Sequence, residues 1–130
     1  MSIKNKLVRD KIPEIIQSQG QSCTTRILDE SEFETALKAK LYEEYLEYIA
    51  DDSTEEIADM LEVIDAILHL RGLSIRGLES MRAKKVERNG AFDKRVYLMK
   101  TVDAIKPTEL SDFAGSQRSD SDTESTTHQN

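Results

Sequence analysis

Two long runs of helical periodicity, joined by the short turn "DDST", constrain the fold of this chain most. Each run opens with the Ser-x-x-Glu spacing of a capping box, which satisfies backbone N–H groups at the start of a helix. The first run predicts a helix over residues 32–50, and the second predicts a helix that Gly72 ends. Because the turn is short, we expect the two helices to be antiparallel neighbours. The two capping boxes are Ser31 with Glu34 and Ser53 with Glu56.

Two further helices are expected outside this pair. Near the N-terminus, Asp10 is a possible N-cap, Pro13 suits a first helical turn and Gly20 is a stop, so a short helix is predicted between them. A later helix is expected over residues 74–89, where Gly90 follows as a C-terminal signal.

The chain is therefore expected to be mainly all-α, with one possible exception. Residues 24–28, "TTRIL", are β-branched and alternating, and residues 94–99, "KRVYLM", are their expected partner in a two-stranded β element. The length of 130 residues suits a single domain, which we place at residues 1–108. Residues 109–130 are rich in Ser, Asp and Thr, so we expect a disordered polar tail there.

Composition excludes several classes of site and location. Cys23 is the single cysteine and the chain has two histidines, so an intrachain disulfide or a zinc site of cysteine and histidine is not expected. No apolar run has the length of a membrane span or of a signal peptide. The sequence thus predicts a cytoplasmic protein that does not enter a membrane.

The charge of −7 is unevenly distributed along the chain. Residues 43–65 carry ten acids and no base, whereas residues 80–100 carry seven bases and two acids. The first eleven residues carry four bases and one acid. Net negative charge and few aromatic residues argue against a nucleic-acid binder, so this layout calls for another explanation.

A helical wheel sorts the acids of the two long helices into two kinds. At about 100° per residue, Glu44 and Glu47 fall within about 40° of the apolar Phe33. Glu56 and Asp59 fall inside the extended apolar arc of the next helix. The remaining acids of that helix lie on its polar face, where we expect an ordinary exposed surface. These are Glu55, Glu62 and Asp65.

Four carboxylates turned toward apolar neighbours require a counter-charge, because desolvation and mutual repulsion both oppose them. The candidates are Lys40, one turn before Glu44, and divalent ions. Carboxylates without His or Cys suit hard ions such as Mg²⁺ or Mn²⁺. The i, i+3 spacing of each pair allows two antiparallel helices to close on shared ions. The alternative is that these acids lie at the edge of the arc and extend into water.

The motifs "EEYLE", with Glu43, Glu44 and Glu47, and "EIAD", with Glu56 and Asp59, resemble those of a known superfamily. They resemble the Glu-Glu-x-x-Glu and Glu-x-x-Asp motifs of the all-α nucleoside triphosphate pyrophosphatases, which include MazG-type enzymes. The segments "KLVRDKIPEII" and "KKVERNGAFDKR" look closest to a small phosphoribosyl-ATP pyrophosphohydrolase-like group. The likeness covers roughly residues 4–100.

The resemblance implies a MazG-like antiparallel helical bundle and roles for particular residues. It implies that four acids bind Mg²⁺, namely Glu44, Glu47, Glu56 and Asp59, and these are the four that the wheel selects. Glu43 matches the leading Glu and is a candidate, with Glu47, for a catalytic role. Basic residues are candidates for binding substrate phosphates. These are Lys40, Lys85, Arg88, Arg9 and Lys11.

The function implied is Mg²⁺-dependent hydrolysis of a nucleoside triphosphate to a monophosphate and pyrophosphate. Apolar arcs this wide cannot be covered by one short third helix, so we also expect a homodimer or higher homo-oligomer that completes the bundle. Two alternatives remain open. One is hydrolysis of phosphoribosyl-ATP in histidine synthesis, and the other is a non-enzymatic helical interaction module.

Overall fold

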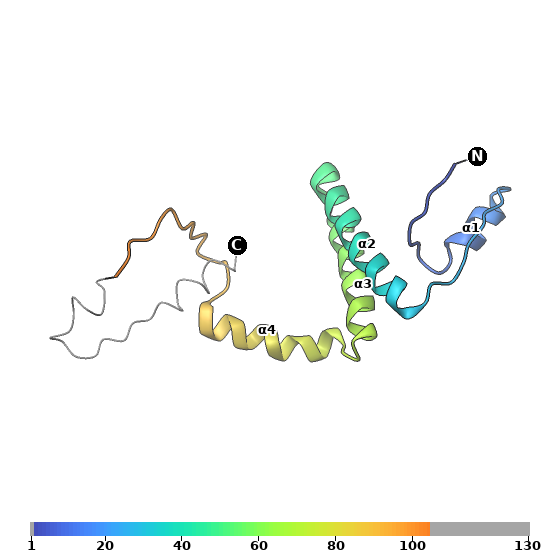
Figure 1. Ribbon diagram of the computed structural model, residues 1–130. Helices are drawn as coiled ribbons and strands as arrows, with labels where there is room; N and C mark the ends of the chain where they lie inside the picture. The colour runs from blue at the N-terminus through green and yellow to red at the C-terminus, as the bar shows by residue number, and fades with distance from the viewer. Residues whose placement is uncertain (1, 105–130) are drawn as a thin grey trace. The chain divides into compact units, whose positions relative to one another are not determined.

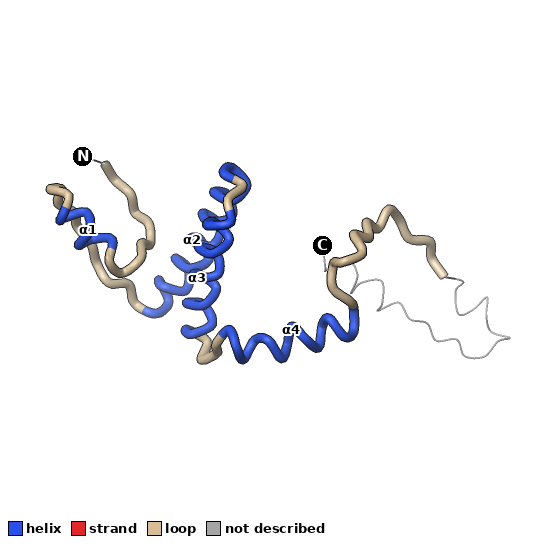
Figure 2. The backbone as a smooth tube through the Cα atoms, turned by 180° about the vertical axis from the view of Figure 1, so that it is seen from behind, coloured by secondary structure: helices blue, strands red, loops and turns tan. Residues whose placement is uncertain are grey.

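The computed structural model describes residues 2–104, and these residues form an all-helical structure (Figures 1 and 2). The chain divides into two compact units between Leu78 and Glu79. The first unit contains three helices and the start of a fourth, which continues into the second unit. The helices are α1 (Ile12–Ser18), α2 (Glu30–Asp51), α3 (Thr54–Leu70) and α4 (Ile75–Asn89). The predicted tail over residues 109–130 lies outside the described residues.

Helices α2 and α3 pack side by side as an antiparallel pair, as the short turn predicts (Figures 1 and 2). The turn is tight because Asp52, the C-cap of α2, is left-handed at φ 54° and is followed directly by Ser53, the N-cap of α3. Asp is one of the few side chains that tolerate this conformation. The tight turn places the last turn of α2 beside the first turn of α3.

The capping box of α2 differs from the predicted one. The N-cap is Asp29, whose carboxylate accepts a hydrogen bond from Glu32 N at 2.8 Å, while the Glu32 side chain accepts one from Asp29 N. Arg26 also donates two hydrogen bonds to the Glu32 carboxylate. The prediction that Ser31 and Glu34 form the box is wrong, because Asp29 and Glu32 offer the same spacing two residues earlier and Arg26 stabilises them.

The N-terminus of α3 uses half of its predicted capping box. Ser53 Oγ accepts a hydrogen bond from Glu55 N at 3.2 Å, so Ser53 is the N-cap as predicted. The Glu56 side chain makes no reciprocal hydrogen bond to Ser53 N among the described residues. The Glu56 side chain is therefore available for contacts other than helix capping.

The remaining helix ends follow the predicted signals, with one exception. Gly72, at φ 76°, ends α3 in a Schellman motif in which Leu73 N donates to Leu68 O and Gly72 N donates to His69 O. Gly90 follows the last residue of α4, as expected. At α1, however, the N-cap is Lys11 rather than Asp10, and no side chain caps the helix.

The predicted β element does not form, since the structure has no strand within residues 2–104 (Figure 2). Residues 24–28 and 94–99 are irregular and mostly exposed: Ile27 is 93% exposed and Tyr97 is 84% exposed. An isolated two-stranded ribbon is marginal without a further surface to pack against, which explains why β-branched composition alone does not produce one here.

Few apolar side chains are buried in the described residues. Leu37 of α2 and Val63 and Leu68 of α3 form the core of the helix pair. Other large apolar residues on the same two helices remain exposed, Tyr42 at 62% and Ile49 at 60% among them. Within the described part of the chain, no helix combines the length and apolar character needed to cross a membrane.

Candidate metal centre

Acidic side chains from α2 and α3 converge on Glu44. Carboxylate oxygens of Glu43, Glu44 and Glu47 lie within 4.8 Å of one another, and so do those of Glu44, Glu56 and Asp59. Glu44 belongs to both sets, so it links two other acids of α2, Glu43 and Glu47, to two acids of α3. The structure therefore brings together all four of the acids that the wheel places on apolar arcs.

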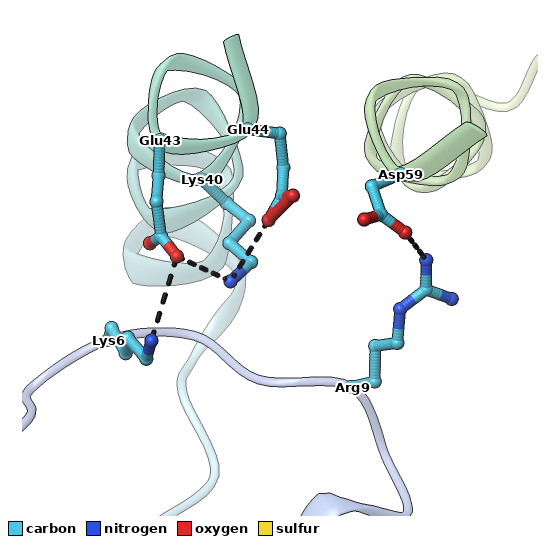
Figure 3. Close-up of polar contacts among 6 residues, drawn as sticks. All are labelled: Lys6, Arg9, Lys40, Glu43, Glu44 and Asp59. Carbon is cyan, nitrogen blue, oxygen red and sulfur yellow. Dashed lines mark hydrogen bonds and ion pairs between the residues drawn. The ribbon is translucent and has the colours of Figure 1, made fainter. Parts of the chain in front are cut away.

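Glu44 is a buried carboxylate that keeps one cationic neighbour. Its side chain is 8% exposed, and its Oε2 lies 3.4 Å from Lys40 Nζ, one turn earlier on α2 (Figure 3). The α2 helix therefore carries its own counter-charge for the acid it buries. Lys40 thus neutralises part of the cluster, as one of the two predicted alternatives requires.

Glu43 lies at the edge of the cluster between two ammonium groups. Its Oε2 accepts a hydrogen bond from Lys40 Nζ at 3.0 Å and lies 3.7 Å from Lys6 Nζ (Figure 3). Burial alone would raise the Glu43 pKa, but the two lysines outweigh burial and lower the pKa below its ordinary value. For Lys40, burial lowers the pKa, but Glu43 and Glu44 outweigh it, so the pKa is raised. Both groups are therefore charged at neutral pH.

Glu56 has the opposite surroundings. Its Oε1 is buried and accepts no hydrogen bond within the described residues. Burial, followed by the negative charges of Glu47, Asp59, Asp51 and Glu44, raises the Glu56 pKa to about 7. The side chain is half-buried, and a carboxylate with one buried oxygen and like charges around it is unfavourable unless a cation or a proton reaches it.

Asp59 is held from outside the helix pair. Arg9, in the irregular segment before α1, donates a hydrogen bond from Nη2 to Asp59 Oδ1 at 2.8 Å. The other carboxylate oxygen of Asp59 is turned toward Glu44 on the neighbouring helix (Figure 3). One oxygen thus fixes the side chain while the other remains directed into the cluster.

This arrangement fits a hard divalent cation. Mg²⁺ binds oxygen ligands at about 2.1 Å, so two opposite ligand oxygens are about 4.2 Å apart, and the oxygens of each set need to move by less than about 1 Å. The buried, unpaired Glu56 Oε1 is the oxygen that such an ion would satisfy. The donor set consists of carboxylates alone, which favours Mg²⁺ or Mn²⁺ over softer metals.

Comparisons with known proteins add little to this picture. The chain matches no protein-family model and no solved structure. A curated protein of Mycolicibacterium smegmatis, described as uncharacterized, is 44% identical to it over 50 residues. The match includes 38% of this chain and 51% of that protein, so the chain spans about half the length of that relative.

The other predicted phosphate-binding residues are placed differently. Lys11 is exposed at the N-cap of α1 and makes no ion pair with an acid of the described residues. Lys85 and Arg88 are exposed on the part of α4 that belongs to the second unit, and their role remains a prediction. Glu55 and Glu62 are exposed, as the wheel predicts for the polar face, whereas Asp65 is half-buried and lies 3.7 Å from His69, one turn later on α3.

Sequence reasoning missed Lys6 as a site residue. The basic composition of the first eleven residues was a signal of its presence. That composition did not assign a partner, because the segment before α1 is irregular and helical periodicity gives no direction to its side chains. The structure places Lys6 beside Glu43 and Arg9 beside Asp59, so this segment contributes to both helices of the cluster.

Proposed function

We propose that this protein is a Mg²⁺-dependent nucleoside triphosphate pyrophosphohydrolase, which releases pyrophosphate and a nucleoside monophosphate. The observation that carries the proposal is the pair of carboxylate sets that share Glu44, with the buried Glu56 Oε1 unpaired beside them. The resemblance of the two acidic motifs to those of the all-α nucleotide pyrophosphatases supports the same assignment.

The acids would have two different roles in the reaction, metal binding and proton acceptance. Glu44, Glu47, Glu56 and Asp59 would hold Mg²⁺, which supplies positive charge to the phosphates and acidifies a water for attack. Glu47 or Glu43 would accept the proton of that water, because both lie beside the shared Glu44. Glu43 has a lowered pKa, so its carboxylate is ionised at neutral pH, as a proton acceptor must be, but it is a weaker base than an ordinary glutamate.

The basic residues would bind the phosphates. Lys40 and Arg9 contact acids of the cluster, so their positive charges would lie beside a triphosphate bound there. Lys11, Lys85 and Arg88 are further candidates from the basic segments that flank the acidic one. This use of charge explains the basic, acidic, basic order of the sequence.

A pyrophosphate-release assay tests the enzyme. Wild type and Glu44→Gln would be compared on canonical and damaged nucleoside triphosphates, with and without Mg²⁺. We expect Mg²⁺-dependent release by wild type and loss of release by Glu44→Gln. Glu62→Gln, on the exposed face of α3, is the matched control and should retain activity. Metal-independent release, or a fully active Glu44→Gln, would refute the proposal.

Phosphoribosyl-ATP belongs in the same assay, because the resemblance includes phosphoribosyl-ATP pyrophosphohydrolase. Faster release from phosphoribosyl-ATP than from any nucleoside triphosphate would move the assignment to that reaction. If no substrate yields pyrophosphate, and Mg²⁺ neither binds nor stabilises the protein, the results would favour the hypothesis of a non-enzymatic helical interaction module.

We also propose that the helix pair forms a homodimer. Large apolar side chains remain exposed on both helices, with Tyr42 and Ile49 on α2 and Ile57 and Leu61 on α3 at 46% exposure or more. A second helix pair that covered them would complete a four-helix bundle. The many exposed apolar side chains and the small core of each pair support this assembly.

Light scattering coupled to gel filtration tests the dimer. We expect the wild-type mass to be twice the 14.8 kDa of the chain. Ile49→Glu would place a charge on the proposed interface and should give a monomer, whereas Glu62→Gln should leave the mass unchanged. A wild-type monomer at high protein concentration would refute the dimer.

A further inference from the structure

The irregular segment of residues 2–9 connects the two helices of the acidic cluster. Lys6 Nζ lies 3.7 Å from Glu43 of α2, and three residues later Arg9 Nη2 lies 2.8 Å from Asp59 of α3. Figure 3 shows the segment running past the ends of both acidic side chains. The segment therefore forms a wall of the site and brings two cations to it.

A cavity of about 230 Å³ lies between this segment and α2. Lys6 and Asn5 line it from the segment, and Lys40 and Glu43 line it from the helix. Ala36 and Ala39, whose side chains are small, leave the space open on the helix side. Pockets that enclose a whole drug-sized ligand measure about 300–1,000 Å³, so this cavity suits a fragment of a nucleotide rather than all of it.

We propose that this cavity holds the terminal phosphates of the substrate, which leave as pyrophosphate, and that Lys6 is a substrate-binding residue. The proposal rests on the proposed function, since it assigns one part of that substrate to one part of that site. It adds a residue, Lys6, and a cavity to the site that the carboxylates define.

The lining favours phosphate over a nucleobase. Two lysines and one acid, Glu43, are among the residues that line the cavity, and charge-assisted hydrogen bonds to phosphate oxygens are among the stronger polar contacts. The residues that line it include no aromatic side chain on which a base could stack. The net positive charge of the lining and the volume of the cavity therefore suit the anionic end of a triphosphate.

Glu43 connects this cavity to the metal centre. In the structure it pairs with both Lys6 and Lys40, and it also belongs to the carboxylate set with Glu44 and Glu47. If Glu43 turned toward an ion held by that set, Lys6 would lose its acidic partner and Lys40 would keep only Glu44, 3.4 Å away. Lys6 would then be available to an anion in the cavity, so occupancy of the carboxylates and of the cavity should favour each other.

Equilibrium dialysis with radiolabelled inorganic pyrophosphate tests the cavity. The full chain would be used in the presence and absence of Mg²⁺. We expect Lys6→Gln to weaken pyrophosphate binding by about tenfold, as the loss of one charge-assisted contact predicts. Lys4→Gln is the matched control, because Lys4 is exposed in the same segment and the change of charge is identical. Its affinity should stay within about twofold of wild type.

A second variant tests the volume of the cavity without changing charge. Ala39→Leu adds three carbons to the cavity wall and should also weaken pyrophosphate binding. Ala39 is exposed on the surface of α2, so the fold is expected to tolerate the larger side chain, which circular dichroism would verify. Mn²⁺ binding, followed by electron paramagnetic resonance, should remain near the wild-type affinity in both Lys6→Gln and Ala39→Leu.

The outcomes separate the two proposals. If wild type binds no pyrophosphate, or if Lys6→Gln binds it as Lys4→Gln does, the cavity is not the phosphate site. The enzyme proposal survives the second result when nucleotide hydrolysis is intact. If binding depends on Lys6 while no nucleotide is hydrolysed, the cavity stands as an anion site and the enzyme proposal is wrong.

Discussion

Glu43 and Glu56 lie in the same acidic cluster and have opposite electrostatic surroundings. Glu43 lies between Lys6 and Lys40, and its pKa is lowered. Glu56 keeps a buried oxygen without a hydrogen bond, and its pKa is raised to about 7 by burial and by neighbouring acids. Lys6 and Lys40 therefore neutralise the α2 edge of the cluster, whereas on α3 Arg9 pairs with Asp59 and Glu56 is left without a cation among the described residues.

This difference indicates where an added cation would be most favourable. A divalent ion near Glu43 would compete with two ammonium groups, whereas an ion near Glu56 would relieve repulsion that the protein leaves uncompensated. The Glu43 side is instead suited to exchange one negative partner for another, as phosphate binding requires. In the proposed reaction the Glu56 side would bind the metal ion and the Glu43 side would bind phosphate. Substitutions on the two sides should therefore have different effects.

The largest expected effect is on metal affinity. Glu56→Gln should weaken Mn²⁺ binding on the order of 100-fold, because the variant loses a carboxylate that has no competing cation. Glu43→Gln should weaken it less, since the protein already neutralises Glu43. Electron paramagnetic resonance of Mn²⁺ measures both affinities, with Glu62→Gln as the exposed control. Equal losses for Glu56→Gln and Glu43→Gln would contradict the division of the cluster.

The next largest effect is on the free energy of unfolding, through the ammonium group of Lys40 on α2. Lys40→Met removes the ammonium group beside the buried Glu44 and should lower the free energy of unfolding by about 3 kcal/mol, because the acid is left without a counter-charge. Lys38→Met, two residues earlier, removes an exposed pair with Glu34 and should change stability by about 0.5 kcal/mol at most. Urea unfolding measures both. Similar values for the two variants would mean that Lys40 does not sustain the burial of Glu44.

The pH dependence of stability tests the surroundings of Glu56 on α3. A carboxyl group whose pKa rises from 4.5 to about 7 on folding binds its proton more tightly in the folded state. Between these values the folded state holds more protons than the unfolded state, so this group makes the metal-free protein less stable as pH rises. Its destabilising contribution is absent well below pH 4.5 and complete above about pH 7.

Thermal unfolding in EDTA measures this contribution. The melting temperature of wild type should fall more between pH 5 and pH 8 than that of Glu56→Gln, by a few degrees. At pH 8 the variant should be the more stable protein. Parallel pH profiles for the two proteins would show that Glu56 titrates near its ordinary value.

The acids of this cluster could be predicted from the sequence because helical periodicity is local. Once α2 and α3 are recognised, the direction of Glu44 or Glu56 follows from residue spacing alone. The antiparallel pairing of the two helices follows from the short turn between them. These two inferences, neither of which needs long-range information, bring the four carboxylates to one place.

The cations that meet the acids were harder to predict. Lys40 is on the same helix as its partners, so spacing assigns it, whereas Lys6 reaches Glu43 from an irregular segment with no fixed period. The capping box of α2 was misplaced because two Ser/Asp-x-x-Glu patterns overlap within six residues, and Arg26 stabilises the earlier one. The β element was wrong because composition favours a strand but does not supply the surface that a strand needs.

The smallest expected effect compares Arg9 with Lys6 as cations of the same segment. Arg9→Gln keeps a donor for Asp59 but removes a positive charge beside the carboxylates, so Mn²⁺ affinity should rise by about fivefold at most, as for an exposed ion pair. The rise should shrink in high salt, because screening weakens the interaction of exposed charges. Lys6→Gln should alter pyrophosphate affinity more than metal affinity, whereas Arg9→Gln should alter both. If Arg9→Gln instead weakens Mn²⁺ binding, the guanidinium group is needed to hold Asp59 toward Glu44, and its positioning role outweighs its charge.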